Sequence, residues 1–125
     1  MMMNGDTPAE TGAELPEESS AVFSPDMMLC GVNTPICAAY LINKPEFVLG
    51  KSESCDGVIS FSPEISHSHA RITWENGTYY ITDLKSTNRT FLNGRALPPE
   101  QKRVFRSGDR ITLSTFIFQA QRINK

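Results

Sequence analysis

The 125 residues are enough for one domain with its own core, and 39% hydrophobic with 21% charged residues is typical of a soluble globular protein. No apolar run approaches the ~20 residues of a membrane span, and the first residues lack the basic and apolar blocks of a signal peptide. The net charge is −2, and the net of +4 on the more basic part, residues 34–125, is too weak to indicate a nucleic-acid partner.

The charge is unevenly distributed along the chain. Residues 1–33 hold six acidic and no basic side chains, whereas residues 34–125 hold twelve basic and eight acidic ones, a net of +4. An acidic head containing Pro, Gly and Ser, followed by a mildly basic body, predicts a flexible segment over 1–33 and a folded domain over 34–125.

The three cysteines, Cys30, Cys37 and Cys55, are an odd number and lack C-x-x-C spacing. This pattern disfavours a disulfide framework or a zinc knuckle and predicts a reducing compartment, the cytoplasm. The two N-x-[ST] matches, Asn76-Gly77-Thr78 and Asn88-Arg89-Thr90, are then coincidental, because a glycan acceptor requires secretion.

From Pro35 onward, short apolar segments alternate with turn residues. The expected strands are 36–42, 46–50, 57–61, 69–75, 78–84, 90–92, 95–97, 110–113 and 115–121. Asn76-Gly77 and Asn93-Gly94 each separate two of them and are strong hairpin signals. No window carries an apolar stripe of helical period. The predicted fold is therefore all-β, an antiparallel β-sandwich of about ten short strands.

Three loops concentrate polar groups: Gly50-Lys51-Ser52, the "SHSH" stretch 66–69, and "STNRTFLNG", 86–94. The loops that enter and leave the central hairpin lie at the same end of a sandwich, so Ser66 and Asn88 are expected to be neighbours. A lysine, a hydroxyl and an amide converging there are suited to a tetrahedral oxyanion.

Other chemistries have weaker support in the sequence. His67 and His69 point the same way on an extended strand, but no third zinc ligand accompanies them. Ser66 lacks the G-x-S-x-G elbow of a hydrolase, and Gly50-Lys51-Ser52 lacks the upstream glycine of a P-loop. We therefore expect no enzyme activity, no metal and no cofactor.

Together these residues resemble the forkhead-associated (FHA) domain, here as a bacterial-type single module. The resemblance covers roughly residues 36–121 and rests on five elements that occur in order. They are Gly50-Lys51, Ser66-x-x-His69, the Asn76-Gly77 hairpin, Ser86-Thr87-Asn88-x-Thr90, and Asn93-Gly94 before Gly108-Asp109. It implies an FHA/SMAD-like sandwich that reads phosphothreonine in partner proteins, in kinase-linked signalling.

The resemblance also implies roles for single residues. The phosphopeptide would contact Lys51, Ser66, His67, Thr87 and Asn88, with Lys51 and Ser66 on the phosphate and Asn88 on the peptide backbone. The structural positions would be Gly50, His69, Asn93 and Gly94.

Two residues depart from the family pattern. Lys51 stands where the family has arginine, so it offers a point charge in place of a planar fork. Arg89 stands where the family usually has glycine, and a positive φ there would strain it. Arg89 also brings a guanidinium near the site, and we include it among the binding candidates. The alternative is an FHA-fold scaffold that binds partners without phosphate because of Lys51 and Arg89.

The acidic head contains two threonines, Thr7 and Thr11. Once phosphorylated, either one could occupy the site in the same or a neighbouring chain. An inert tail is the other interpretation.

Overall fold

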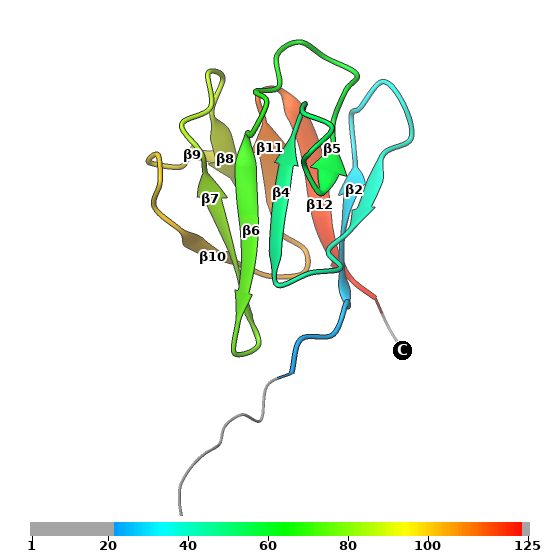
Figure 1. Ribbon diagram of the computed structural model, residues 1–125, viewed down its shortest axis with the longest axis vertical. Helices are drawn as coiled ribbons and strands as arrows, with labels where there is room; N and C mark the ends of the chain where they lie inside the picture. Colours follow the sequence, from blue (N-terminus) through cyan, green and yellow to red (C-terminus); the bar gives the residue numbers. More distant parts are fainter. Residues whose placement is uncertain (1–21, 124–125) are drawn as a thin grey trace, which may run out of the picture.

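Two β-sheets pack face to face in the computed structural model, which describes residues 22–123 (Figure 1). The five-stranded sheet has the order β10-β7-β6-β4-β5, and the six-stranded sheet has the order β3-β2-β12-β11-β8-β9. The first sheet contains β4 (Glu46–Gly50), β5 (Gly57–Val58), β6 (Ala70–Glu75), β7 (Thr78–Asp83) and β10 (Arg103–Phe105). The second contains β2 (Met27–Gly31), β3 (Ala39–Leu41), β8 (Thr90–Leu92), β9 (Arg95–Ala96), β11 (Arg110–Leu113) and β12 (Phe116–Arg122).

The predicted all-β sandwich is confirmed. Residues 22–123 contain no helix, and therefore none of the length and apolarity that a membrane crossing requires. Nearly all neighbouring strands run antiparallel; β4 and β5, which pair in parallel through Leu49 and Gly57, are the exception.

The core lies between the sheets and follows the period-two pattern of the strands. In β6, Ala70 and Ile72 are fully buried while Arg71 and Thr73 are partly exposed. In β12, Phe118 and Ala120 are buried on the facing side. Alternating side chains thus supply the apolar faces that hold the two sheets together.

Both Asn-Gly pairs form tight turns. Asn76 and Gly77 have φ of 50° and 87°, and Asn93 and Gly94 have φ of 50° and 86°. Positive φ at both central residues is what a type I′ hairpin requires, and asparagine and glycine tolerate it best.

The sandwich begins earlier than the charge pattern indicated. β2 lies within the segment 1–33, yet it pairs with β3 and β12 inside its sheet, and Met27 and Leu29 are fully buried. Its sequence, MMLCG, lacks β-branched and aromatic residues, so local propensity gave little signal of a strand. The head up to residue 21 lies outside the described residues.

Two further strands are much shorter than expected, and one strand was not expected. β3 covers only Ala39–Leu41, because the residues before it form a loop in which Ile36 is 58% exposed. β5 ends at Val58, well before Ser62-Pro63. β10 was not expected; it is a three-residue strand that forms by pairing with Ile81, Tyr80 and Tyr79 of β7.

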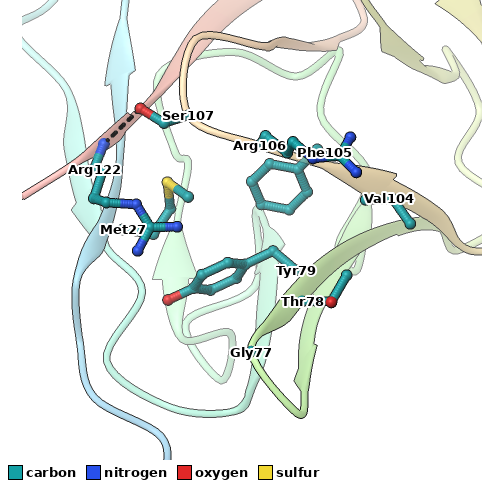
Figure 2. Close-up of a pocket in the computed structure, with 9 residues that line it drawn as sticks. All are labelled: Met27, Gly77, Thr78, Tyr79, Val104, Phe105, Arg106, Ser107 and Arg122. Carbon is teal, nitrogen blue, oxygen red and sulfur yellow. Dashed lines mark hydrogen bonds between the residues drawn. The ribbon is translucent and has the colours of Figure 1, made fainter. Parts of the chain in front are cut away.

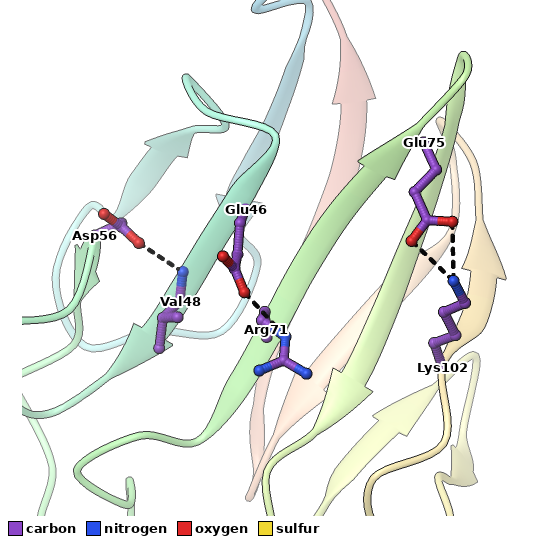
Figure 3. Close-up of polar contacts among 6 residues, drawn as sticks. All are labelled: Glu46, Val48, Asp56, Arg71, Glu75 and Lys102. Atoms are coloured by element: carbon purple, nitrogen blue, oxygen red, sulfur yellow. Dashed lines mark hydrogen bonds and ion pairs between the residues drawn. The ribbon is translucent and has the colours of Figure 1, made fainter. Parts of the chain in front are cut away.

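Charged side chains lie along the outer face of the five-stranded sheet (Figure 3). Lys102 Nζ donates to both carboxylate oxygens of Glu75, at 2.9 and 2.8 Å, and Arg71 pairs with Glu46 at 3.7 Å. Exposed pairs of this kind each contribute under about 1 kcal/mol to stability. They keep this face polar, so the fold depends on the core behind it.

The two ends of the sandwich differ in character. The last residues of β4 and β7 and the first residue of β6 lie at one end of the sandwich. The loops after Gly50, before Ala70 and after Asp83 therefore lie together there (Figure 1). The β6–β7 hairpin lies at the opposite end, where Phe23 packs edge-on against Trp74 with ring centroids 5.4 Å apart. The described chain therefore enters at the end away from the gathered loops.

Candidate functional site

The turn after β4 places Lys51 against the loop that precedes β6. The main-chain N of Lys51 donates to Ser66 O at 2.9 Å, and Ser52 N donates to His67 O at 3.1 Å. A Cβ on Gly50 would lie 2.1 Å from the His67 carbonyl oxygen, so only glycine permits this approach. Gly50 is thus the residue that lets Lys51 lie beside Ser66.

His69 connects two of the polar loops from a fully buried position. Its Nδ1 accepts a hydrogen bond from Ser66 N at 3.1 Å, and its Nε2 lies 2.9 Å from Arg89 O, to which it donates. These partners assign the neutral tautomer with the proton on Nε2. Burial lowers the pKa of His69, although the hydrogen bond to Arg89 and the charge of Asp83 act in the opposite direction.

The same hydrogen bonds bear on the zinc interpretation. Both ring nitrogens of His69 are engaged with main-chain groups, so neither offers a lone pair to a metal shared with His67. Within residues 22–123, no group of three His, Cys, Asp or Glu side chains is arranged to hold a metal ion.

The loop after β7 meets the loop before β6 through two hydrogen bonds. Thr87 N donates to Ser66 Oγ at 3.0 Å, and Asn88 Nδ2 donates to Glu64 O at 2.9 Å. The expected neighbourhood of Ser66 and Asn88 is therefore present in the structure.

These loops enclose a concavity of about 330 Å³. Its lining residues are Lys51, Pro63, Glu64, Ile65, Ser66, His67, Thr87 and Asn88. The lining includes five of the six predicted binding residues. It brings one ammonium, two hydroxyls and one carboxamide to a single shallow site, a combination suited to an oxyanion.

Arg89, the sixth candidate, does not line the concavity. Its main chain has φ of 75°, in the left-handed region that disfavours side chains, and its carbonyl accepts from both His69 Nε2 and Ser114 N. The main chain of Arg89 thus holds the loop after β7 against His69 and Ser114. Its side chain is exposed and does not line the concavity.

Two hydroxyls of the "STNRT" stretch belong to the scaffold. Ser86 and Thr90 are buried, and the hydroxyls of both donate to Oδ1 of the fully buried Asp83. The other carboxylate oxygen, Oδ2, accepts from Ser86 N at 3.2 Å. Asp83 was not singled out in the sequence, where it reads as the end of a strand. The signal available was one acid with hydroxyl residues three and seven positions later.

The FHA domain family model matches residues 47–114, which contain every residue of this concavity. The chain belongs to the FHA family. Among curated proteins, this FHA domain is similar to zeaxanthin epoxidase, chloroplastic, of Spinacia oleracea, at 35% identity over 99 residues. It is also similar to Protein FraH of Nostoc sp., at 38% identity over 60 residues.

These matches cover 73% and 44% of this chain, but only 15% and 21% of the two relatives. Among solved structures, an FHA domain of an Arabidopsis thaliana hypothetical protein is 29% identical with a TM-score of 0.73, covering 86% of this chain and 93% of that one. The N-terminal FHA domain of S. cerevisiae Rad53p, in complex with a phosphothreonine peptide, has the same fold at 19% identity and a TM-score of 0.69, covering 79% of this chain and 94% of that one.

A second hollow lies at the hairpin end of the FHA sandwich, with a volume of about 250 Å³ (Figure 2). Tyr79 and Arg122 border it, and both bind Asp26: Tyr79 Oη donates to Oδ1 at 2.8 Å and Arg122 donates to Oδ2 at 2.7 Å. Burial and the Asp26 carboxylate raise the pKa of Tyr79, which stays protonated. These contacts hold the residue that precedes β2, Asp26, against β7 and β12. None of the predicted binding residues lines this hollow.

Proposed function

We propose that this FHA domain binds a phosphothreonine-containing segment of a partner protein in the concavity between Lys51 and Asn88. The observation that carries the proposal is the convergence of Lys51, Ser66, Thr87 and Asn88 on one shallow site. Three loops far apart in the sequence supply these groups, and a purely structural requirement would not demand that their polar side chains face the same hollow.

Each group has a role that follows from its hydrogen bonds. Ser66 Oγ accepts from Thr87 N, so its own proton is available to a phosphate oxygen. Asn88 Nδ2 donates to Glu64 O, so its Oδ1 is available to accept from a peptide N–H. Lys51 supplies the positive charge and takes part in no ion pair with a described residue.

The comparisons support this role by analogy. The Rad53p FHA domain was solved with a phosphothreonine peptide, and a second FHA structure of the same fold, 19% identical, concerns phosphothreonine-dependent interactions. We extend the phosphothreonine ligand of those FHA domains to the corresponding loops of this chain.

As part of the same proposal, the chain acts as an interaction module in kinase-linked signalling and not as an enzyme. Ser66 has no base beside its hydroxyl in the described contacts, because His69 accepts from the main-chain N of Ser66. The three free cysteines, one of them exposed, favour a reducing compartment, for which we propose the cytoplasm.

A phosphate-independent scaffold is the second candidate. The observation that favours it is Arg89, whose side chain does not line the concavity and so does not restore the fork that Lys51 lacks. This candidate predicts that the loops bind partner segments through Asn88 and neighbouring main-chain groups alone.

We also propose that Thr7 or Thr11, once phosphorylated, binds in this concavity as a ligand from the chain itself. Both lie outside the described residues. The described chain enters beside Trp74, at the end away from the site. The 12 residues from Thr11 to Phe23 span at most about 40 Å when extended. That length exceeds the roughly 20 Å of a six-residue strand, so a phosphorylated head could reach the site of its own or a neighbouring chain.

A fluorescence anisotropy titration tests these alternatives. Phosphothreonine, phosphoserine and unmodified versions of one peptide library are titrated against the wild type, Lys51→Ala and Ser66→Ala. The phosphothreonine proposal expects selective binding that both substitutions weaken. Equal binding of all three libraries would favour the scaffold and contradict the main proposal.

A further inference from the structure

Glu64 lies on the border of the proposed phosphopeptide site, beside the residues assigned to the ligand. Its side chain is exposed and lines the concavity together with Lys51. Its main-chain carbonyl receives the 2.9 Å hydrogen bond from Asn88 Nδ2. The position of Glu64 is therefore tied directly to the residue proposed to hold the peptide backbone.

Hydroxyl groups from a distant turn orient the Glu64 carboxylate. Ser114 Oγ donates to Oε1 at 2.7 Å, and Thr115 Oγ1 lies 3.4 Å from the same oxygen. Both hydroxyls come from the turn between β11 and β12, fifty residues away in the sequence. The other oxygen, Oε2, accepts no hydrogen bond from a described residue.

The same turn is also bonded to the loop that carries Asn88. Ser114 N donates to Arg89 O at 3.0 Å, so Glu64, Asn88, Arg89 and Ser114 form a closed ring of covalent and hydrogen-bonded links. A carboxylate held in such a ring loses little side-chain freedom when it binds a cation, which reduces the usual entropic cost of an exposed ion pair.

The charges of the concavity are therefore of both signs. Lys51 and Glu64 both line it, and neither forms an ion pair within residues 22–123. An anion held at Lys51 leaves the Glu64 carboxylate facing the rest of the ligand. A basic ligand side chain would neutralise that carboxylate, whereas an acidic one would be repelled by it.

We propose that Glu64 is a specificity-determining residue that selects phosphothreonine segments with a lysine or arginine close to the phosphothreonine. This inference rests on the proposed function and adds the chemical class of the preferred partner. An ion pair between the exposed but oriented Glu64 carboxylate and a basic side chain of the ligand should raise affinity about two- to fivefold, relative to alanine at the same peptide position.

The test uses the full chain and an oriented set of phosphothreonine peptides in anisotropy titrations. One peptide has alanine at every flanking position and is measured both phosphorylated and unmodified, and the others carry a single arginine or a single glutamate at each position in turn. The measured quantity is the affinity of each arginine peptide divided by that of the alanine peptide. At one or two positions, arginine should bind about two- to fivefold tighter and glutamate weaker than alanine.

Glu64→Gln should bring the arginine-to-alanine ratio close to one, since glutamine keeps the size and removes the charge. Glu75→Gln is the matched control, because Glu75 lies at the hairpin end and pairs with Lys102; it should leave the ratio as in the wild type. The wild-type ratio should also fall when salt is raised from about 0.05 to 0.5 M.

The two levels of proposal fail in different ways. If the alanine peptide binds only when phosphorylated, but no arginine position gains affinity or Glu64→Gln leaves the gain unchanged, the role of Glu64 is overturned and the proposed function stands. If no peptide binds in a phosphorylation-dependent way, the proposed function fails and the inference fails with it.

Discussion

The imidazole of His69 and the main-chain carbonyl of Arg89 are joined by a 2.9 Å hydrogen bond from Nε2. Through Nδ1 the same ring accepts from Ser66 N, so one buried side chain sets the separation of the two loops that carry Ser66 and Asn88. The geometry of the proposed site thus depends on a buried residue that does not itself line the concavity.

Ser66→Ala should weaken phosphothreonine peptide binding by tenfold or more, because the substitution removes a hydroxyl proposed to donate to a charged phosphate. The stability loss should be smaller, about 0.5–1.5 kcal/mol, since only the bond from Thr87 N is lost. Anisotropy and urea unfolding measure the two effects. Ser60→Ala, an exposed serine outside the site, is the control; an undiminished affinity for Ser66→Ala would contradict its phosphate contact.

Replacing Lys51 tests the missing guanidinium fork. Lys51→Arg should tighten phosphopeptide binding by up to about tenfold, because two parallel charge-assisted bonds replace a single point contact. Lys51→Met should weaken binding by about tenfold. Lys85→Met serves as the control, since Lys85 is exposed and does not line the concavity. If Lys51→Met and Lys85→Met behave alike, Lys51 does not bind phosphate.

Two substitutions of Arg89 separate its backbone from its side chain. Arg89→Gly should raise the free energy of unfolding by up to about 1 kcal/mol, because glycine adopts the observed φ of 75° without strain. Arg89→Ala keeps the strain and removes the guanidinium. It should lower peptide affinity by no more than about threefold, the effect of a distant exposed charge. A larger loss would show that this guanidinium contacts the ligand.

The stability of the fold should decrease in mild acid through His69. Burial lowers its folded pKa below the ordinary 6.5, so between those two values the unfolded chain binds a proton that the folded chain does not. Stability from this group is therefore complete above pH 6.5 and falls as the pH decreases to the folded pKa, by at most about 1.4 kcal/mol per pH unit. Urea unfolding at pH 7.5 and 5.5 measures the slope. His69→Gln should be less stable at pH 7.5 and should show a smaller pH dependence; an equal slope would assign it to other groups.

Truncations should locate the start of the folded unit. Removing residues 1–21 should leave the melting temperature within a few degrees of the full chain. Removing residues 1–33 should prevent folding, because it deletes β2 from between β3 and β12 and with it the buried Met27 and Leu29. Each of these side chains contributes about 2–3 kcal/mol by burial. Circular dichroism melting measures both. Cooperative folding of the chain without residues 1–33 would contradict the importance of β2.

The sequence predicted those parts of the fold that are encoded locally. The Asn-Gly turns and the alternation through Ala70 and Ile72 identify hairpins and half-buried strands, and both depend on residues next to one another in the chain. β2 was not predicted because MMLCG has little strand propensity of its own. β10 was not predicted because its three residues are too few to show an alternating pattern, although Val104 and Phe105 favour strands. β2 and β10 become strands through pairing with β12 and β7.

In the candidate site, too, some contacts could be predicted from the sequence and others depend on packing between distant segments. Strand direction and the polarity of the loops were enough to bring Ser66, Asn88 and Lys51 together, and the family resemblance added binding roles for His67 and Thr87. The buried Asp83 was missed, although the hydroxyl residues three and seven positions after it were a signal. The hydrogen bond from Ser114 to Glu64 could not be predicted, because it joins residues fifty positions apart. Predicting it requires knowing that the β11–β12 turn approaches the loop before β6, which no local pattern specifies.

The first and last described segments meet through a hydrogen bond from Ile123 N to Asp26 O at 2.8 Å. Such adjacency makes a domain easy to graft, because a host protein can accept it within a loop without separating the flanking chain ends. The two segments leave the sandwich at the end opposite the loops after β4, before β6 and after β7 (Figure 1), which line the concavity. A host protein carrying this domain would present the binding loops to solvent, because the connections to the host lie at the opposite end of the sandwich.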